Sequence, residues 1–357
     1  MSQLKLTDVA KINMGQSPSS ETYNSEKNGL PFYQGNVDFG EKYPTVRIWC
    51  DKPTKIAEPG DILMSVRAPI GALNYANEKC CIGRGLAAIT PDPDMTSSEF
   101  IYWFLRARHS ELNRIGTGST FKAINRKTLE SIEFPKYNKN EQYYIAEILS
   151  KIDKTIGEKK AQLEKLDNLI KARFVEMFGD EDPVFVFDDV LIDDTKNGFK
   201  LDSSNYSNLG KIAIVDQGQK RICGYINAVD GKAPWSKEAI IFGDHTEMFK
   251  YINFPFYLGA DGTKLLSPKN GWNTRFLYHY LDINYHKRLG YMRHFKYLKE
   301  MSFIQPDLDR QEEFCMFCTQ VDKSKFTLSN ELAMGNFYIR LIHDCIMHGC
   351  IDLRVPQ

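Results

Sequence analysis

The sequence predicts an α/β (α+β) fold in which long helices, paired as an antiparallel coiled coil, separate two mixed α/β domains. Two observations lead to this prediction. The segment from Phe134 to Lys154 returns weakly as Phe303 to Lys323, at a constant offset of 169 residues. The stretch 138–178 has apolar residues at helical spacing and contains no proline. Together they indicate a duplicated domain with helical connections.

Length and composition are compatible with this organisation. The chain has 357 residues, which is enough for two domains that each bury a core. Its formal net charge is zero, so any nucleic-acid binding must depend on local basic surfaces. We find no leader pattern and no apolar run of the roughly 20 residues that a membrane span needs. We therefore expect a reduced cytoplasmic protein.

The cysteines are expected to be core residues. The chain has eight of them without a regular framework. Cys80 and Cys81 adjoin in an apolar, strand-like run, and Cys315 and Cys318 fall on the face of a predicted helix that should be buried. We therefore favour packing over zinc or redox chemistry.

Residues 1–137 are expected to form the first domain. Between Glu58 and Pro91, short runs of Ile, Val, Leu and Ala are broken by Gly and Pro at turn spacing, which indicates strands. Another strand begins at Pro31 and enters a turn at Gly40. The segment 97–115 is then predicted to be one helix, with an N-cap at its first or second serine.

The stretch 138–178 is predicted to be a central spacer helix. About 40 residues at ~1.5 Å per residue give a rod of roughly 60 Å. Lys159 and Arg173 interrupt its apolar seam, which should pack on the repeated helix after residue 308. The seam residues are Ile145, Leu149, Ile152, Ile156, Leu163, Leu166, Ile170 and Met177.

The second half repeats this order with a different end. Residues 179–306 are expected to form the second domain, and 307–332 the distal helix. Residues 333–357 are rich in Cys, His and Met, and we expect an atypical tail without a heptad seam. The tail is interpreted either as an altered carboxyl end, which would shorten the helix pair, or as a short helix on the second domain.

Over residues 1–325, the chain resembles the specificity subunits of type I restriction-modification enzymes. The segments that carry the resemblance are KLTDVAKINMGQSPS, EPGDILMSVRAPIG, IGTGSTFKAINRKTLESIEFP and NEQYYIAEILSKID. The resemblance implies two target-recognition domains that each read one half of a bipartite DNA site. It also implies that the helices serve as a spacer and dock methyltransferase subunits.

The resemblance also implies the partners and cofactors. The partners would be double-stranded DNA, two methyltransferase (modification) subunits and restriction/translocase subunits, with no membrane. S-adenosylmethionine, ATP and Mg²⁺ would be bound by those subunits, and this chain would need no cofactor.

Two basic segments occupy equivalent places in the halves. From Arg106 to Lys127 there are six cationic residues and one carboxylate. From His286 to Lys299 there are five cationic residues and no carboxylate. Such segments contact phosphates and base edges. The expected DNA-binding residues of the first domain are Tyr33, Gln34, Asn36, Arg67, Arg84, Ser119, Thr120, Lys122, Asn125, Arg126 and Lys127. Those of the second domain are Lys220, Arg221, Tyr225, Asn227, Lys264, Arg288, Tyr291, Arg293, His294 and Lys296.

No catalytic or metal site is predicted. The string from Asn253 to Tyr257 lacks the second proline of an amino-methyltransferase loop, and Gly259 to Lys264 lacks the spacing of a phosphate loop. Three alternatives remain open: a stand-alone, two-headed DNA-binding regulator, a defective or phase-variable specificity subunit, and a nuclease or methylase that acts alone.

Overall fold

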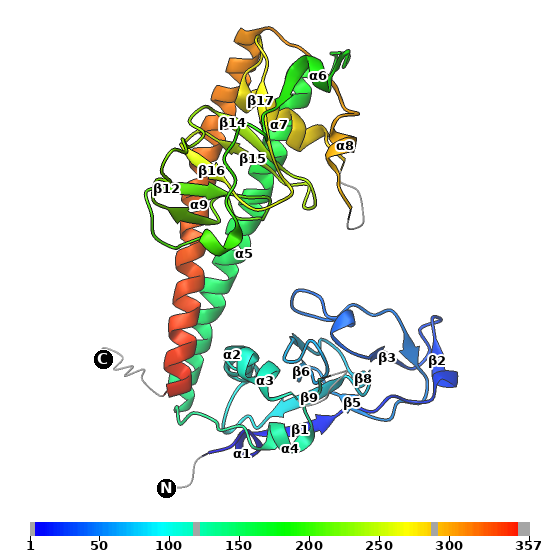
Figure 1. Ribbon diagram of the computed structural model, residues 1–357. Helices are drawn as coiled ribbons and strands as arrows, with labels where there is room; N and C mark the ends of the chain where they lie inside the picture. Colours follow the sequence, from blue (N-terminus) through cyan, green and yellow to red (C-terminus); the bar gives the residue numbers. More distant parts are fainter. Residues whose placement is uncertain (1–3, 117–121, 287–291, 349–357) are drawn as a thin grey trace. The chain divides into compact units, whose positions relative to one another are not determined.

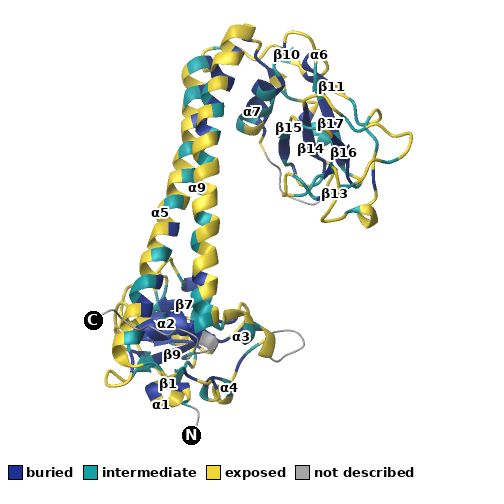
Figure 2. Cartoon of the chain, turned by 90° about the vertical axis from the view of Figure 1, so that its left-hand side faces the viewer, coloured by how far each residue is buried: buried dark blue, intermediate teal, exposed yellow. Residues whose placement is uncertain are grey.

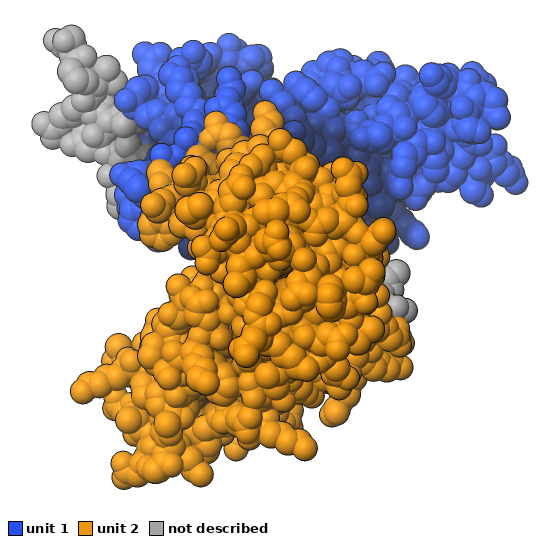
Figure 3. Space-filling model, turned by 90° about the horizontal axis from the view of Figure 1, so that it is seen from above, with its two compact units in different colours: residues 1–160, 329–357 blue, residues 161–328 orange. Residues whose placement is uncertain are grey.

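The computed structural model describes residues 4–116, 122–286 and 292–348. It divides into unit 1, which is Met1–Lys160 with Ser329–Gln357, and unit 2, which is Ala161–Leu328 (Figure 3). Each unit has two main β-sheets, short helices and a part of each long helix, α5 (Lys139–Phe178) and α9 (Leu308–His348) (Figure 1). The predicted mixed α/β class is confirmed. Within the described residues, no helix combines the length and apolarity that a membrane crossing requires.

Unit 1 is built on an antiparallel sheet with the strand order β1-β9-β6-β7. Its strands are β1 (Ala10–Met14), β9 (Leu86–Pro91), β6 (Ile62–Ser65) and β7 (Leu73–Tyr75). The second sheet has the order β2-β4-β3-β8-β5, and β3 and β8 run parallel. Its strands are β2 (Tyr23–Asn24), β4 (Trp49–Cys50), β3 (Leu30–Tyr33), β8 (Cys80–Ile82) and β5 (Ile56–Ala57).

The helices of unit 1 pack against the first sheet. They are α1 (Leu6–Val9), α2 (Ser98–Ala107), α3 (His109–Ile115) and α4 (Arg126–Glu130). Ser97 caps α2 by accepting the main-chain N–H of Phe100 at 3.2 Å. The prediction of one helix over 97–115 was wrong, because the chain leaves helical geometry at Arg108 (ψ 2°) and α3 starts there. The guanidinium of Arg108 bonds to Glu111 and to the Glu133 carbonyl, which stabilises the break.

Unit 2 repeats this topology. Its first sheet has the order β11-β17-β14-β15, with β11 (Leu191–Asp193), β17 (Thr263–Pro268), β14 (Ala239–Gly243) and β15 (Phe249–Ile252). Its second has the order β13-β12-β16, with β13 (Gly224–Ile226), β12 (Ile212–Val215) and β16 (Phe256–Leu258), and β12 and β16 run parallel. The short elements are α6 (Phe187–Val190), α7 (Thr274–Asn284), α8 (Phe295–Leu298) and the pair β10 (Phe185–Val186) and β18 (Ser302–Phe303). A parallel strand pair beside an antiparallel four-stranded sheet thus occurs in both units.

The cores of both units are formed largely by apolar strands and the long helices (Figure 2). In unit 1, Ile145, Leu149 and Ile156 of α5 are buried with the aromatic residues of α2. In unit 2, Ile170 is joined by Phe174 and Phe178, which pack against Phe276 and Phe314. The predicted seam is therefore buried or half-buried, but it omitted the two phenylalanines. Cys80, Cys81, Cys315 and Cys318 are buried.

The prediction for residues 333–348 was wrong. Instead of an atypical tail without a seam, the chain continues as α9, and its residues pack on unit 1 rather than on unit 2. Five of its buried or half-buried positions alternate steps of three and four residues, namely Leu332, Gly335, Ile339, Ile342 and Ile346. The seam is not recognisable in the sequence, because Gly335 occupies one of its inward positions and has no apolar side chain.

Ion pairs join the two long helices within each unit, and their order in unit 2 shows that the helices run antiparallel there. In unit 1, Lys159 of α5 pairs with Glu331 of α9 at 2.6 Å. In unit 2, Lys325 pairs with Asp167 at 2.5 Å, and Arg173 with Glu313 at 2.8 Å. The two residues that interrupt the predicted seam, Lys159 and Arg173, thus carry charged contacts across the pair.

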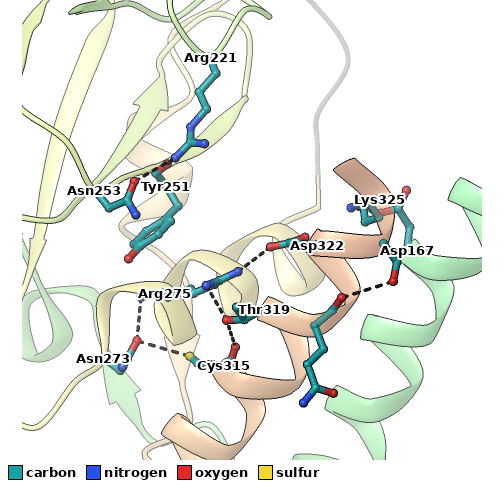
Figure 4. A network of polar contacts seen from close by, with 12 residues as sticks. Asp167, Arg221, Tyr251, Asn253, Asn273, Arg275, Cys315, Thr319, Asp322 and Lys325 are labelled. Atoms are coloured by element: carbon teal, nitrogen blue, oxygen red, sulfur yellow. Dashed lines mark hydrogen bonds and ion pairs between the residues drawn. The ribbon is translucent and has the colours of Figure 1, made fainter. Parts of the chain in front are cut away.

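A polar network attaches α7 to α9 in unit 2 (Figure 4). The guanidinium of Arg275 donates to Asp322 at 2.6 Å and to the Thr319 hydroxyl at 2.7 Å. The N-cap of α7, Asn273, lies beside the Cys315 thiol at 3.4 Å. In unit 1, Asp153, the repeat partner of Asp322, pairs with Arg106 of α2 at 2.9 Å. Both units therefore join the aromatic helix to a long helix through the repeated aspartate.

Candidate nucleic-acid interface

Five segments of unit 1 meet where β3, β6 and β8 end; we call this region edge 1. It consists of residues 15–17, 34–36, 66–68, 83–85 and 122–127. The Gly83 N–H donates to the Tyr33 carbonyl at 2.8 Å, and the Val66 N–H donates to the Gly85 carbonyl at 2.9 Å. The Ile124 N–H donates to the Val66 carbonyl at 2.9 Å. These bonds bring residues from distant parts of the sequence to one side of the unit.

The close approach at edge 1 depends on glycine. A Cβ on Gly85 would lie 2.2 Å from the carbonyl oxygen of Gln34, whereas a Cβ on Gly35 would meet nothing within 4 Å. The buried carboxylate of Asp38 stabilises the turn at Gln34. It accepts a hydrogen bond from the Gln34 N–H at 2.7 Å and forms an ion pair with Arg47. Sequence reasoning missed Asp38, although its position four residues after Gln34 is a turn signal.

Edge 1 displays exposed positive charge. The side chains of Arg67, Arg84, Lys122 and Lys127 are exposed, and in the part of the chain that the structure describes none of them makes an ion pair. Arg126 is also exposed, but it pairs with Glu130 at 3.3 Å and donates to the Ile12 carbonyl. Unpaired guanidinium and ammonium groups beside main-chain turns can bind phosphate oxygens.

Other residues predicted in the first domain have structural roles. Tyr33 is fully buried, and burial raises the pKa of its hydroxyl, so a base contact is not compatible with its position. Asn125 caps α4 by accepting the Thr128 N–H at 3.0 Å. Gln34 is exposed and Asn36 is half-buried at edge 1. Ser119 and Thr120 lie outside the described residues.

Unit 2 contains a corresponding meeting for four of the five segments; we call it edge 2. It consists of residues 216–218, 244–246, 259–262 and 292–297. The Gly259 N–H donates to the Val215 carbonyl at 2.7 Å, and the Asp244 N–H donates to the Gly262 carbonyl at 2.7 Å. The His294 N–H donates to the Asp244 carbonyl at 2.8 Å. The three main-chain bonds correspond one to one with those of edge 1.

The residues predicted in the second domain are divided between edge 2 and other places. Arg293 and Lys296 are exposed at edge 2, and Lys220 is exposed in the loop that follows it. Asn227 follows Ile226, which pairs with Ile212 at the start of β12, so it lies at the opposite end of the strand from edge 2. Tyr225 is half-buried in β13. Arg288 and Tyr291 are outside the described residues.

Three further predicted residues are occupied by intramolecular contacts. His294 is fully buried, and its Nδ1 lies 2.9 Å from the buried Glu247 carboxylate, which argues against a base contact. Lys264 pairs with Asp193 at 3.3 Å and lies over the Phe295 ring. Arg221 donates to the carbonyl of Tyr251 and the side chain of Asn253 (Figure 4).

Comparisons with known proteins find similarity to type I restriction specificity subunits. A family model for the type I restriction modification DNA specificity domain matches residues 1–168. Over 161 residues, the chain is 42% identical to the putative type I restriction enzyme MjaX specificity subunit of Methanocaldococcus jannaschii, covering 45% of this chain and 38% of that protein. The MjaIX specificity subunit of the same organism is 27% identical over 264 residues, covering 70% of this chain and 60% of that protein.

A solved structure extends the similarity across the whole chain. The S subunit of a type I restriction-modification system from M. genitalium matches with a TM-score of 0.62 at 16% identity, covering 97% of this chain and 95% of that one. At this identity, the match shows a common fold. The chain spans less than two thirds of the length of the two curated relatives described above. Residues 1–168 thus match the type I restriction modification DNA specificity domain in sequence, and the chain as a whole shares the fold of a type I S subunit.

Proposed function

We propose that this chain is the DNA-recognition subunit of a type I restriction-modification complex. Each unit binds one half of a bipartite DNA site, unit 1 through edge 1 and unit 2 through edge 2. The observation that carries the proposal is that the same strand ends meet, through corresponding main-chain bonds, once in each unit. A duplicated binding surface on one chain gives bivalent binding to a split site.

The residues proposed to contact DNA are those that are accessible at the two edges and in the loop after β12. In unit 1 they are Gln34, Asn36, Arg67, Arg84, Lys122, Arg126 and Lys127. In unit 2 they are Lys220, Arg293 and Lys296. Arginine and lysine side chains bind phosphates or guanine edges, and amides bind adenine edges, so this set contains both positioning and reading groups.

The long helices are the proposed docking surface for methyltransferase subunits, of which we expect two. Several large apolar side chains of α5 and α9 remain exposed although the inward seam is filled. They are Tyr143, Leu169, Val175, Met316, Phe326, Met334, Phe337 and Leu341. Exposed apolar side chains along a helix pair favour a protein partner. S-adenosylmethionine binding, base flipping, methylation, ATP-driven translocation and cleavage belong to the partner subunits on this proposal.

The proposal is tested by co-expression with the cognate modification subunit. The mass of the purified complex gives the number of subunits, and mapping of methylated adenines in host DNA gives the sequence that is read. We expect two modification subunits and a split motif with a fixed gap. A complex with one modification subunit and no split motif would indicate a defective form. Tight binding by the chain alone to a palindromic site, without any complex, would favour a stand-alone regulator.

A further inference from the structure

Corresponding positions of the two edges can be paired through their shared main-chain bonds. In the turns 83–85 and 259–262, the N–H of the first glycine donates to the carbonyl at the end of a central strand. The carbonyl of the last glycine accepts the N–H of Val66 in edge 1 and of Asp244 in edge 2. The residue before the final glycine is Arg84 in edge 1 and Asp261 in edge 2. Val66 corresponds to Asp244, and Ile124 corresponds to His294, because the same N–H to carbonyl bond joins each pair.

Most cationic positions of edge 1 have no cation at edge 2. Counting from these anchors, Arg67 corresponds to His245, Lys122 to Met292 and Lys127 to Tyr297. Lys296 retains the charge of Arg126, and Arg293 adds a cation where edge 1 has Ala123. Among the five cationic positions of edge 1, one therefore keeps its charge in the second unit.

Edge 2 instead carries carboxylates, whereas edge 1 has none within its five segments. Asp216 follows β12 where edge 1 has Gln34, and its carboxylate lies 3.7 Å from the Nζ of the buried Lys250. Asp244 is buried and accepts the Phe295 N–H at 2.8 Å. Asp261 is fully exposed at the end of its turn, 3.6 Å from the Lys200 Nζ. Lys287 and Arg288 of the sequence lie outside the described residues.

This difference matters for DNA because phosphate contacts dominate affinity. Each phosphate that a cation neutralises releases counterions, so log K falls with log salt by about 0.9 per contact on duplex DNA. A carboxylate near the backbone repels phosphate, but it can accept a hydrogen bond from the cytosine amino group in the major groove. An edge with many cations and an edge with mixed charge should thus contribute differently to one complex.

We propose that unit 1 supplies most of the phosphate contacts of this chain, while unit 2 binds its half-site with few phosphate contacts. This proposal rests on the proposed function, since it assigns unequal roles to the two edges of the same DNA-binding subunit. Edge 1 anchors the complex on the duplex through Arg67, Arg84, Lys122 and their neighbours. Edge 2 contributes contacts that depend less on salt, with the exposed Asp261 in place of Arg84.

The test compares two triple variants in the complex with the modification subunit. The unit 1 triple is Arg67→Ala with Arg84→Ala and Lys122→Ala. The matched unit 2 triple is Lys220→Ala with Arg293→Ala and Lys296→Ala. All six side chains are exposed, so neither triple removes buried packing. Fluorescence anisotropy with a random-sequence duplex, and then with the mapped methylated sequence, gives the slope of log K against log salt. Circular dichroism and co-purification with the modification subunit check folding and assembly.

We expect the unit 1 triple to reduce the slope by about 2.7, which is three contacts at about 0.9 each, and the unit 2 triple to reduce it by less than about 1. The Asp261→Asn variant should bind DNA more tightly than the wild type, and its slope of log K against log salt should not be smaller. Equal reductions, a larger reduction in the unit 2 triple, or no reduction in either would overturn the unequal division. A wild-type complex without salt-dependent DNA binding would instead overturn the proposed function itself.

Discussion

Gln142 and Gln311, which lie 169 residues apart in the sequence, make the same two contacts, each in its own unit. Nε2 of Gln142 donates to the carbonyls of Tyr137 at 2.9 Å and Met95 at 3.1 Å. Nε2 of Gln311 donates to the carbonyls of Pro306 at 2.8 Å and Gly271 at 3.2 Å. Each buried glutamine thereby ties the first turn of a long helix to the loop before the aromatic helix.

The first prediction concerns these glutamines. Gln142→Ala and Gln311→Ala should each destabilise one unit by about 1 to 3 kcal/mol, because the buried side chain and its hydrogen bonds to two main-chain carbonyls are lost. Hydrogen exchange should accelerate at the start of α5 in the first variant and at the start of α9 in the second. The exposed Gln162 and Gln320 provide matched controls, whose alanine variants should leave exchange unchanged. Exchange that stays slow in both core variants would contradict this role.

The second prediction concerns the hidden seam of α9. A Cβ on Gly335 would lie 2.9 Å from Cγ1 of Ile156, so a large side chain cannot enter without separating the helices. Gly335→Leu should lower the free energy of unfolding by about 1 to 3 kcal/mol through overpacking. Gly157→Leu is the matched control, since its Cβ meets nothing within 4 Å, and it should stabilise by roughly 0.5 to 1 kcal/mol through helix propensity. Urea titration measures both, and equal effects would argue against the close contact.

The third prediction concerns the glycine of edge 1. Gly85→Ala places a methyl group against the Gln34 carbonyl and should destabilise unit 1 by about 1 to 3 kcal/mol while displacing Arg84. Gly35→Ala, in the same turn region but with open space around its Cβ, should be tolerated. Thermal melts and DNA-binding titrations of the two variants provide the comparison. Normal stability and binding of the Gly85 variant would show that edge 1 does not need the close approach.

The fourth prediction concerns acid stability. Burial lowers the pKa of His279 to about 4, and the nearby Asp322 only partly opposes this effect. Because the unfolded chain then binds a proton that the folded chain does not, stability is fully present above about pH 6.5 and falls towards pH 4. The loss should be on the order of 3 kcal/mol.

His279→Phe preserves a ring beside Phe314 and removes the titration. Its unfolding free energy should fall less than that of the wild type between pH 6.5 and pH 4, whereas His286→Phe, at an exposed position, should follow the wild type. Urea titrations across this pH window measure the difference. A parallel pH dependence in wild type and His279→Phe would refute the assignment to His279.

Much of the architecture could be predicted from local patterns. The repeat around Gln142 and Gln311 predicted two related units, and the apolar spacing from Ile145 to Met177 predicted the seam of α5. Such patterns are readable because helix periodicity is a local property of the sequence. The seam of α9 was missed because Gly335 marks close helix contact by having no side chain, which a search for apolar residues does not detect.

The sequence by itself determined the duplication, the mixed α/β class and the positions of the basic segments, because each follows from residue type and spacing. Only the tertiary structure decided which polar residues are accessible at the two edges. Tyr33 and His294 look like readers in the sequence, but they are buried, while Asn227 lies at the wrong end of its strand. The correspondence between the positions of Arg84 and Asp261 could also not be read from the sequence. That correspondence depends on main-chain hydrogen bonds between strands far apart in the chain, which no local pattern encodes.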